Sequence, residues 1–135
     1  MKTDCLNVLA LAYVGDSIYE VVIRTLLLKK GLCKVNDLQK EAVQYVSAKA
    51  QSRYLKMLLD QESLTTEEIQ IVKRARNHKG SRHPKHTDIV TYKESTGLEA
   101  LIGYHYLNGH FNRIQEIMEI MLGEKLCISM EKMSH

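Results

Sequence analysis

The stretch LAYVGDSIYE, residues 11–20, decides how this chain folds, because it sets an acid at the centre of an apolar and aromatic segment. That acid is Asp16, which directly follows Gly15. A carboxylate with little polar company needs a partner or a metal ion, since an unpaired charge is costly to bury. A glycine costs a helix about 1 kcal/mol relative to alanine, so we expect another helix or a ligand to approach the backbone at Gly15.

Apolar residues around this stretch recur at helical spacing from residue 6 to residue 30, and Gly31 then predicts the end of the helix. The rest of the chain favours helices too, because it has one Pro, seven Gly and no alternating strand pattern in 135 residues. We therefore predict an all-α domain, a helical bundle. Its further helices are expected over residues 37–45, 48–60, 65–76, 88–108 (beginning between 88 and 92) and 111–122.

Short polar signals predict where these helices begin. Asp4, Asn36 and Ser47 are the expected N-caps of the first three helices. Thr65 and Glu68 form a capping box for the fourth. Residues 77–87 hold both a Gly and the one Pro and are expected to form a loop.

Composition excludes several classes of protein. Hydrophobic residues make up 44% and charged residues 26%, as in an ordinary globular domain. Cys5, Cys33 and Cys127 are an odd number without a CxxC pair, which favours reduced thiols in a cytoplasmic protein. The N-terminus is a poor signal peptide, and the longest apolar stretch, residues 21–28, is too short to span a bilayer. We expect no membrane contact.

The second acid of interest is Glu99 in STGLEALIGY, residues 95–104, where it lies among apolar residues between Gly97 and Gly103. Glycines at a helix crossing let two backbones approach, which would bring Asp16 and Glu99 together. Two close carboxylates repel, so one takes up a proton unless a cation neutralises them. Mg²⁺, with Mn²⁺ as a substitute, suits such oxygen ligands. The alternative stays open that each acid pairs with an arginine or points at solvent.

A basic segment is the third feature, since residues 73–85 contain no acid. Without its six positive charges the chain would carry 13 basic against 16 acidic residues, a net charge of −3, so its basicity is local. Such a segment favours phosphate and therefore nucleic-acid binding. His83 and His86 lack a further zinc-ligand pattern. The candidate RNA-binding residues are Lys73, Arg74, Arg76, Asn77, Lys79, Arg82 and Lys85.

Together these features indicate metal-assisted hydrolysis of a phosphodiester, in which the cation polarises a phosphoryl oxygen and activates a water. Here the sequence resembles a known family. LAYVGDSIYE is similar to the signature helix of ribonuclease III, and STGLEALIGYHYL to its second acidic motif. With KRARN, PKHTD and TYKEST the chain resembles mini-ribonuclease III, the bacterial branch without a double-stranded RNA-binding domain.

The resemblance implies a homodimer of ribonuclease III domains that cuts double-stranded RNA with Mg²⁺ and leaves a 5′-phosphate and a 3′-hydroxyl. Its substrate would be the 23S ribosomal RNA precursor, with a ribosomal protein as a candidate partner that presents the RNA. Asp16 and Glu99 would be the catalytic, metal-binding acids. The catalytic domain is expected over residues 1–125, followed by a tail of residues 126–135. Tyr13, Val14 and Ile18 could serve the core or the dimer interface.

The chain departs from larger members of that family at two positions, where Ala12 and Thr96 stand in place of further acids. Water is therefore expected to complete the coordination of the metal. Glu20 could support the site or simply form a surface salt bridge. Two other functions remain as alternatives: a catalytically inactive double-stranded RNA-binding module, and a helical interaction protein whose basic loop docks on an acidic partner.

Overall fold

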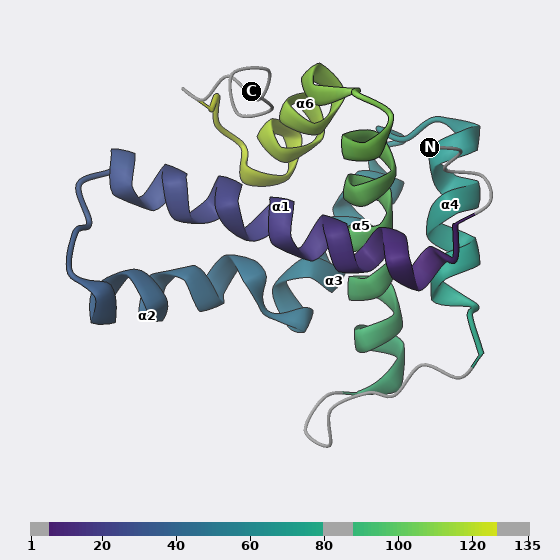
Figure 1. The fold of residues 1–135 in the computed structure, drawn as a ribbon, viewed down its shortest axis with the longest axis horizontal. Helices are drawn as coiled ribbons and strands as arrows, with labels where there is room; N and C mark the ends of the chain where they lie inside the picture. Colours follow the sequence, from purple (N-terminus) through teal and green to yellow (C-terminus); the bar gives the residue numbers. More distant parts are fainter. Residues whose placement is uncertain (1–5, 80–87, 127–135) are drawn as a thin grey trace.

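The computed structural model describes residues 6–79 and 88–126, and within these ranges every regular element is a helix. The prediction of an all-α fold is confirmed (Figure 1). None of the helices within these ranges is long and apolar enough to cross a membrane. The helices are α1 (Val8–Lys29), α2 (Val35–Val46), α3 (Ala48–Asp60), α4 (Thr66–Arg76), α5 (Ile89–Leu107) and α6 (Phe111–Leu122).

Some of the predicted features lie outside the described residues. They are the cap Asp4, the thiols of Cys5 and Cys127, most of the predicted loop with Arg82, His83, Lys85 and His86, and the tail from residue 127.

The local signals for helix ends are confirmed in three places. The hydroxyl of Ser47 accepts a hydrogen bond from the backbone of Ala50 at 3.2 Å. Thr65 and Glu68 form the complete capping box at the start of α4. Gly31 adopts a positive φ value of 100° just after α1, where a left-handed residue ends a helix. Gly123, with a φ of 70°, ends α6 in the same way.

Two predicted N-caps are wrong. Helix α1 is capped by Asn7, whose Oδ1 accepts from the backbone of Leu9 at 2.8 Å, so Asp4 is not its cap. Helix α2 begins at Val35, after Lys34, which makes no side-chain cap hydrogen bond. Asn36 therefore lies inside the first turn of α2, because the helix starts earlier than the polar signal suggests.

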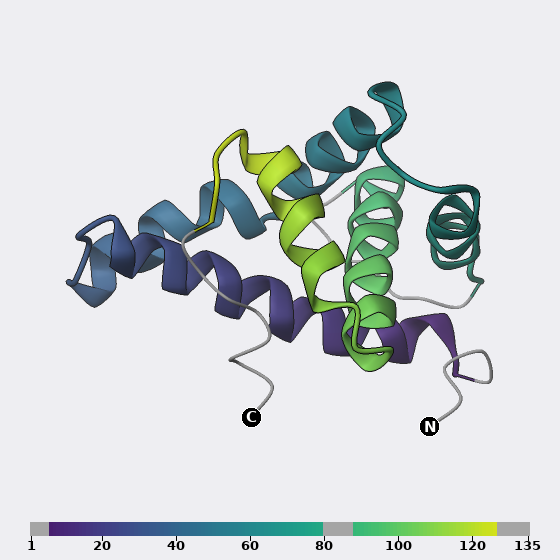
Figure 2. The ribbon, with the colours of Figure 1, turned by 90° about the horizontal axis from the view of Figure 1, so that it is seen from above.

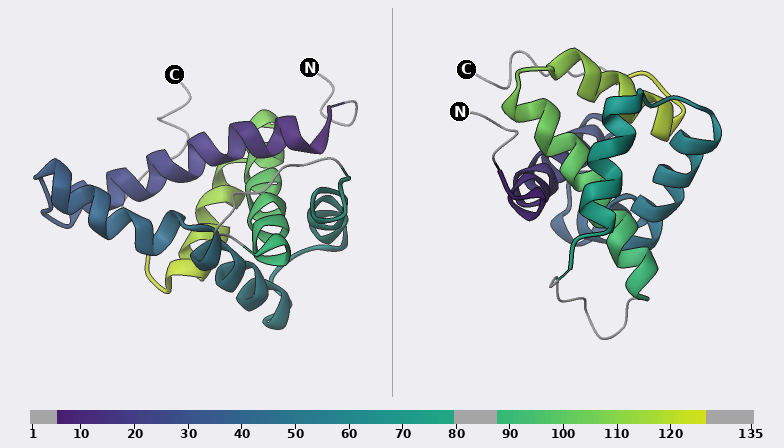
Figure 3. Two further views of the ribbon diagram at one scale, coloured as in Figure 1. Left: turned by 90° about the horizontal axis from the view of Figure 1, so that it is seen from below. Right: turned by 90° about the vertical axis from the view of Figure 1, so that its right-hand side faces the viewer.

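Helix α5 is the centre of the molecule and contacts α1, α3, α4 and α6. Figure 1 shows α1 running across α5, with α4 on the side of the N-terminal end of α1. Beyond the crossing α1 extends away from α5, and α2 returns alongside it, as the view from above also shows (Figure 2). Figure 3 shows α3 and α4 around α5, and its left-hand view, from below, shows the α1–α2 pair projecting as an arm.

The crossing of α1 and α5 is a backbone-to-backbone contact between two glycines. A Cβ atom on Gly15 would lie 1.7 Å from the carbonyl oxygen of Glu99, and one on Gly103 would lie 1.9 Å from that of Leu11. No side chain fits at either position, so the expected close approach at Gly15 is confirmed. Gly97 does not share this contact: it faces α4, where a Cβ would lie 3.2 Å from the side chain of Val72.

The core around this crossing, in the part of the chain that the structure describes, is largely aliphatic, as the composition predicts, and includes one buried tyrosine. Tyr19 of α1 is fully buried, and its hydroxyl donates to the carbonyl oxygen of Tyr45 at 2.7 Å, which ties α2 to α1. Other large buried side chains are Leu11, Ile23, Leu27, Leu55, Leu58, Leu98, Leu101, Ile102, Ile114, Ile117 and Met118.

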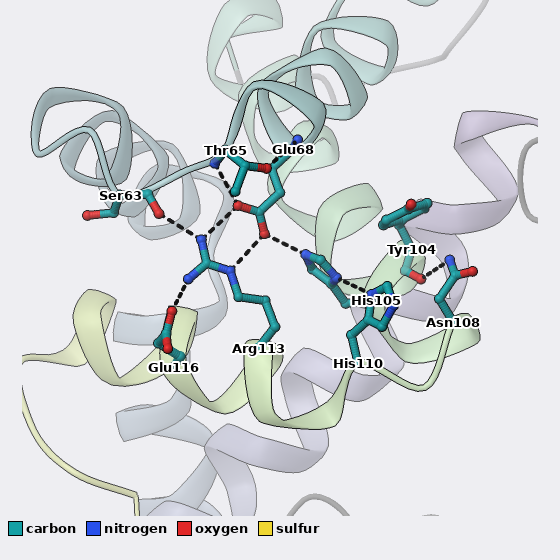
Figure 4. A network of polar contacts seen from close by, with 9 residues as sticks. All are labelled: Ser63, Thr65, Glu68, Tyr104, His105, Asn108, His110, Arg113 and Glu116. Atoms are coloured by element: carbon teal, nitrogen blue, oxygen red, sulfur yellow. Dashed lines mark hydrogen bonds and ion pairs between the residues drawn. The ribbon is translucent and has the colours of Figure 1, made fainter.

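A buried polar network joins α4, α5 and α6 (Figure 4). The carboxylate of Glu68 accepts from Arg113 at 2.9 and 2.7 Å and contacts Nε2 of His105 at 2.6 Å. Arg113 also donates to the carbonyl oxygen of Ser63 at 2.7 Å. Burial alone would raise the pKa of Glu68, but the hydrogen bonds from Arg113 and His105 hold it well below its usual range. This stabilisation is present above the unfolded-state pKa and is lost in strong acid.

We predict that Arg113→Met lowers the free energy of unfolding by about 3–5 kcal/mol, because it leaves the buried Glu68 charge without its main partner. Chemical denaturation at pH 7 measures this change. Lys30→Met is the matched control, since Lys30 and Glu124 form an ion pair at 3.0 Å in which both side chains are exposed. That control should cost about 1 kcal/mol or less. Equal losses in the two variants would contradict the assigned role of the network.

Candidate active site

The α1–α5 crossing places Asp16 beside Glu99. Both residues adjoin the glycine contact: Asp16 follows Gly15, and the carbonyl of Glu99 occupies the space that a Cβ of Gly15 would need. The two acids belong to different helices and are brought within hydrogen-bonding reach of each other. The predicted pairing of Asp16 with Glu99 is therefore confirmed as geometry.

The two carboxyls have different surroundings. Asp16 is exposed, although it stands in an apolar stretch, whereas Glu99 is half-buried. Burial, then a hydrogen bond to Asp16 and the negative charge of Asp16, raise the pKa of Glu99 to about 9. Without a cation, Glu99 therefore keeps its proton at neutral pH and donates it to Asp16. The sequence leads us to expect that Asp16 is the buried acid, but the more buried of the two is Glu99.

Gln51 of α3 lies next to Glu99, and sequence reasoning missed it. It is 1% exposed, and its Oε1 accepts a hydrogen bond from the hydroxyl of Ser95 on α5. The presence of its side chain lowers the pKa of Glu99, against the larger effects that raise it. A sequence signal did exist: Gln51 is a polar residue in the apolar stripe of α3, in register with Leu55 and Leu58.

The two positions that lack an acid contribute no ligand. Ala12 is buried among apolar residues of α1 and α4. Thr96 is buried as well, and its hydroxyl donates to the carbonyl oxygen of Tyr92 at 3.0 Å. Glu20 forms the expected surface salt bridge, with Arg24 at 2.8 Å, and its charge adds to the rise in the pKa of Glu99.

The residues present fit a hard divalent cation. Two carboxyls from different helices converge, one of them solvent-exposed, and together they carry an electrostatic strain that a cation would relieve. Among the described residues, no group of three or more His, Cys, Asp or Glu side chains has metal-binding geometry. Asp16 and Glu99 would therefore hold the ion with oxygen ligands from water or substrate in the remaining positions.

The described part of the basic segment lies at the end of α4. Lys73, Arg74 and Lys79 are exposed, as is Asn77, the C-cap of α4, while Arg76 is half-buried. Ile71 and Ala75 of the same helix pack in one apolar cluster with Val8, Leu11 and Ala12 of α1. The basic end of α4 is thereby fixed to the half of α1 that leads to Asp16.

A second group of basic residues lies along one face of α3, and sequence reasoning missed it as well. Lys49, Arg53 and Lys56 are all exposed and recur at i, i+4 and i+7, so they share one face of the helix. Lys56 lies 4.0 Å from the carboxylate of Glu94. The spacing alone could have identified this stripe, but these residues are interspersed with the apolar residues that fill the core.

Known proteins are similar to this chain over most of its length. The Ribonuclease III domain profile matches residues 9–110. A Mini-ribonuclease 3 of Streptococcus pneumoniae is 42% identical over 118 residues, which cover 87% of this chain and 92% of that protein. A Mini-ribonuclease 3 of Symbiobacterium thermophilum is 45% identical over 111 residues, 82% of this chain and 84% of that one.

A crystal structure of a protein from Fusobacterium nucleatum shows the same fold. It has a TM-score of 0.78 and 35% sequence identity, and it covers 88% of this chain and 93% of its own. The Ribonuclease III domain match includes both Asp16 and Glu99. By its sequence, its helical fold and its relatives, the chain belongs to the ribonuclease III family, in the mini-ribonuclease III branch.

Proposed function

We propose that this endoribonuclease cleaves double-stranded RNA with Mg²⁺, or Mn²⁺ in its place, held by Asp16 and Glu99, and leaves a 5′-phosphate and a 3′-hydroxyl. The observation that carries the proposal is the convergence of these two carboxyls at the α1–α5 crossing of a ribonuclease III domain. The physiological substrate we propose is the 23S ribosomal RNA precursor, by similarity to the family, in the cytoplasm, with a ribosomal protein as a candidate presenting partner.

The chemistry assigned to the chain's own residues is binding and orientation. A bound divalent cation supplies a Lewis acid for the phosphoryl oxygen and a water of lowered pKa. Asp16, on the exposed side, and Glu99 would hold the cation between them as carboxylates, at a position that the RNA backbone can reach. The rigid glycine contact fixes the distance between them, so that the acids need no rearrangement when the phosphate arrives.

The grip on RNA is assigned to the basic end of α4 and the segment after it. A-form duplexes are recognised mostly through phosphates and 2′-hydroxyls, which suits exposed Lys and Arg side chains better than base-reading pockets. Lys73, Arg74, Arg76, Asn77 and Lys79 are the described members of this surface, and Arg82 and Lys85 extend it in sequence. The stripe on α3 offers further phosphate contacts.

We propose a homodimer, with the α1–α2 arm as its interface. No residue of α2 is buried, and Val35 and Val43 are 65% and 58% exposed. A groove of about 560 Å³ between α1 and α2 is lined by Leu28, Val35, Leu38 and Val43. The same helix α1 carries Asp16, and Tyr13 on it is 80% exposed and therefore outside the core. Two sites related by a two-fold axis would address the two antiparallel strands of a duplex.

The domain assignment is a proposal as well: the catalytic domain spans residues 1–125, with 126–135 as a tail. The alternative function, an RNA-binding module without catalysis, draws on the buried, ligand-free positions Ala12 and Thr96. Incubation of the pure protein with a long RNA duplex and Mg²⁺ separates the two, since a module would bind and yield no product.

We predict that Asp16→Asn and Glu99→Gln each slow cleavage of duplex RNA by about a thousandfold or more. A metal ion contributes several kcal/mol to such a transition state, and each 1.4 kcal/mol is a factor of ten. Single-turnover gels with 5′-labelled RNA measure the rate. Asp60→Asn and Glu67→Gln, two exposed acids, are the matched controls and should cut normally. Normal cleavage by either site variant would refute the assigned roles.

A second prediction concerns pH in the absence of metal. Glu99 has a pKa of about 9 in the folded protein against 4.5 as a free side chain, so between these values the folded state binds more protons than the unfolded state. Stability from this group is therefore full below about pH 4.5 and falls as the pH rises towards 9. Urea unfolding across this range should show a steeper decline for the wild type than for Glu99→Gln, and Mg²⁺ should reduce the difference. Parallel curves would place Glu99 in a different environment.

A third prediction concerns salt. Replacing Lys73 and Arg74 together by Gln should weaken RNA binding and reduce the slope of log K against log[salt] by up to about 2 units, about 0.9 for each phosphate that is no longer neutralised. The double variant Lys34→Gln/Lys125→Gln removes two exposed positive charges elsewhere and serves as the control. Filter binding with an uncleaved duplex in Ca²⁺ gives both slopes. Equal slopes in the two double variants would assign the RNA surface to another part of the molecule.

A further inference from the structure

Gln51 is held in one orientation between α3 and α5. Its side chain is 1% exposed, and Ser95, which donates to its Oε1, is also buried. Ser95 lies four residues before Glu99, one turn earlier on the same face of α5. Because the hydroxyl fixes the carbonyl half of the amide, the amino half has a defined direction as well.

The amino half of this amide has no hydrogen-bond partner among the described residues. Nε2 of Gln51 is buried and unpaired, although buried N–H groups are nearly always bonded and an unmet one costs about 1–3 kcal/mol. Ser95 holds the carbonyl end of the amide one turn before Glu99 on the same face of α5, and the side chains of Gln51 and Glu99 are close enough to interact. The unpaired N–H groups therefore lie next to the Glu99 carboxyl.

We infer that Gln51 is a positioning residue for Glu99: its Nε2 donates to one oxygen of the Glu99 carboxylate and leaves the other oxygen for a divalent cation. The inference rests on the proposed function, since it assigns a role within the proposed metal site. The amide orients the carboxylate without competing for its charge, which a lysine or arginine in this place would do. Ser95 serves the same end by holding the amide.

The experiment measures Mn²⁺ binding to the RNA-free protein at pH 7.5 from the paramagnetic resonance signal of free Mn²⁺. Gln51→Met keeps the volume of the side chain and removes the donor. We expect its Mn²⁺ affinity to fall about 10- to 100-fold, the usual cost of losing a group that orients a metal ligand. Its thermal midpoint without metal should change little, because the substitution removes an unpaired buried N–H group together with the acceptor of the Ser95 hydroxyl, and these two effects oppose each other.

Ser52→Ala is the matched control. Ser52 is the next residue on α3, equally buried, and its hydroxyl donates to Glu94 at 3.3 Å and not to the site. Its Mn²⁺ affinity should equal that of the wild type. If Gln51→Met also binds Mn²⁺ as the wild type does, or if it only loses stability, Gln51 has a structural role and the inference is wrong.

Two further variants separate the possible failures. Ser95→Ala frees the amide of Gln51 and should weaken Mn²⁺ binding to a smaller extent; if Gln51→Met does not fold, an unchanged affinity in Ser95→Ala overturns the inference. Glu99→Gln tests the proposed function itself. A wild type that binds no Mn²⁺, or a Glu99→Gln variant that binds it fully, would overturn the metal site, whereas a normal wild type with an unaffected Gln51→Met overturns only the role of Gln51.

Discussion

The contact between Gly15 and Gly103 is the constraint on which the rest of the structure depends. With no side chain on either residue, α1 and α5 touch through their backbones. This contact brings Asp16, which follows Gly15, close to Glu99, whose carbonyl lies against Gly15. The attraction that closes this contact is apolar, since Leu11, Tyr19, Leu98 and their neighbours are buried around it. Two like charges are thus brought together by packing that neither of them favours.

Protonation of Glu99 removes the repulsion between the two carboxyls. The groups around Glu99 leave it free to lose this proton when a cation binds. A buried basic partner would hold Glu99 ionised permanently, as Arg113 does for Glu68. Around Glu99 the structure instead places a neutral amide, and the nearby charges of Asp16 and Glu20 are negative. Within residues 6–79 and 88–126, the Glu68 carboxylate thus has its basic partner already, whereas the Asp16–Glu99 pair has none. The pair can therefore gain from an added cation.

Local sequence predicted most of this fold and the proximity of the two acids at the candidate site. Ser47 and Thr65 were correct as caps because their hydrogen bonds span only three residues. Asn36 failed because Val35 already belongs to the helix, and a cap signal says nothing about how packing extends a helix backwards. Glu99 could be found because it resembles Asp16 in its setting, an acid among apolar residues near a glycine.

Gln51 could not be assigned a role in the same way. Its partners, Ser95 and Glu99, are more than forty residues away, and only the packing of α3 on α5 brings them together. A single Gln in an apolar stripe is compatible with many environments, so its meaning depends on the tertiary fold. The same holds for the basic end of α4, whose placement beside α1 follows from the cluster of Ile71 and Ala75 with Leu11.

Helix α2 has a consequence for how the molecule opens. It has no buried residue, although Leu38 and Ala42 pack against the main cluster and the Tyr19 hydroxyl holds its end. A helix with so little buried surface exchanges its amide hydrogens through local opening, at a free energy well below that of global unfolding. In the proposed dimer that opening would require the subunits to part first. The amide protection of α2 would then depend on protein concentration, while that of α5 would not.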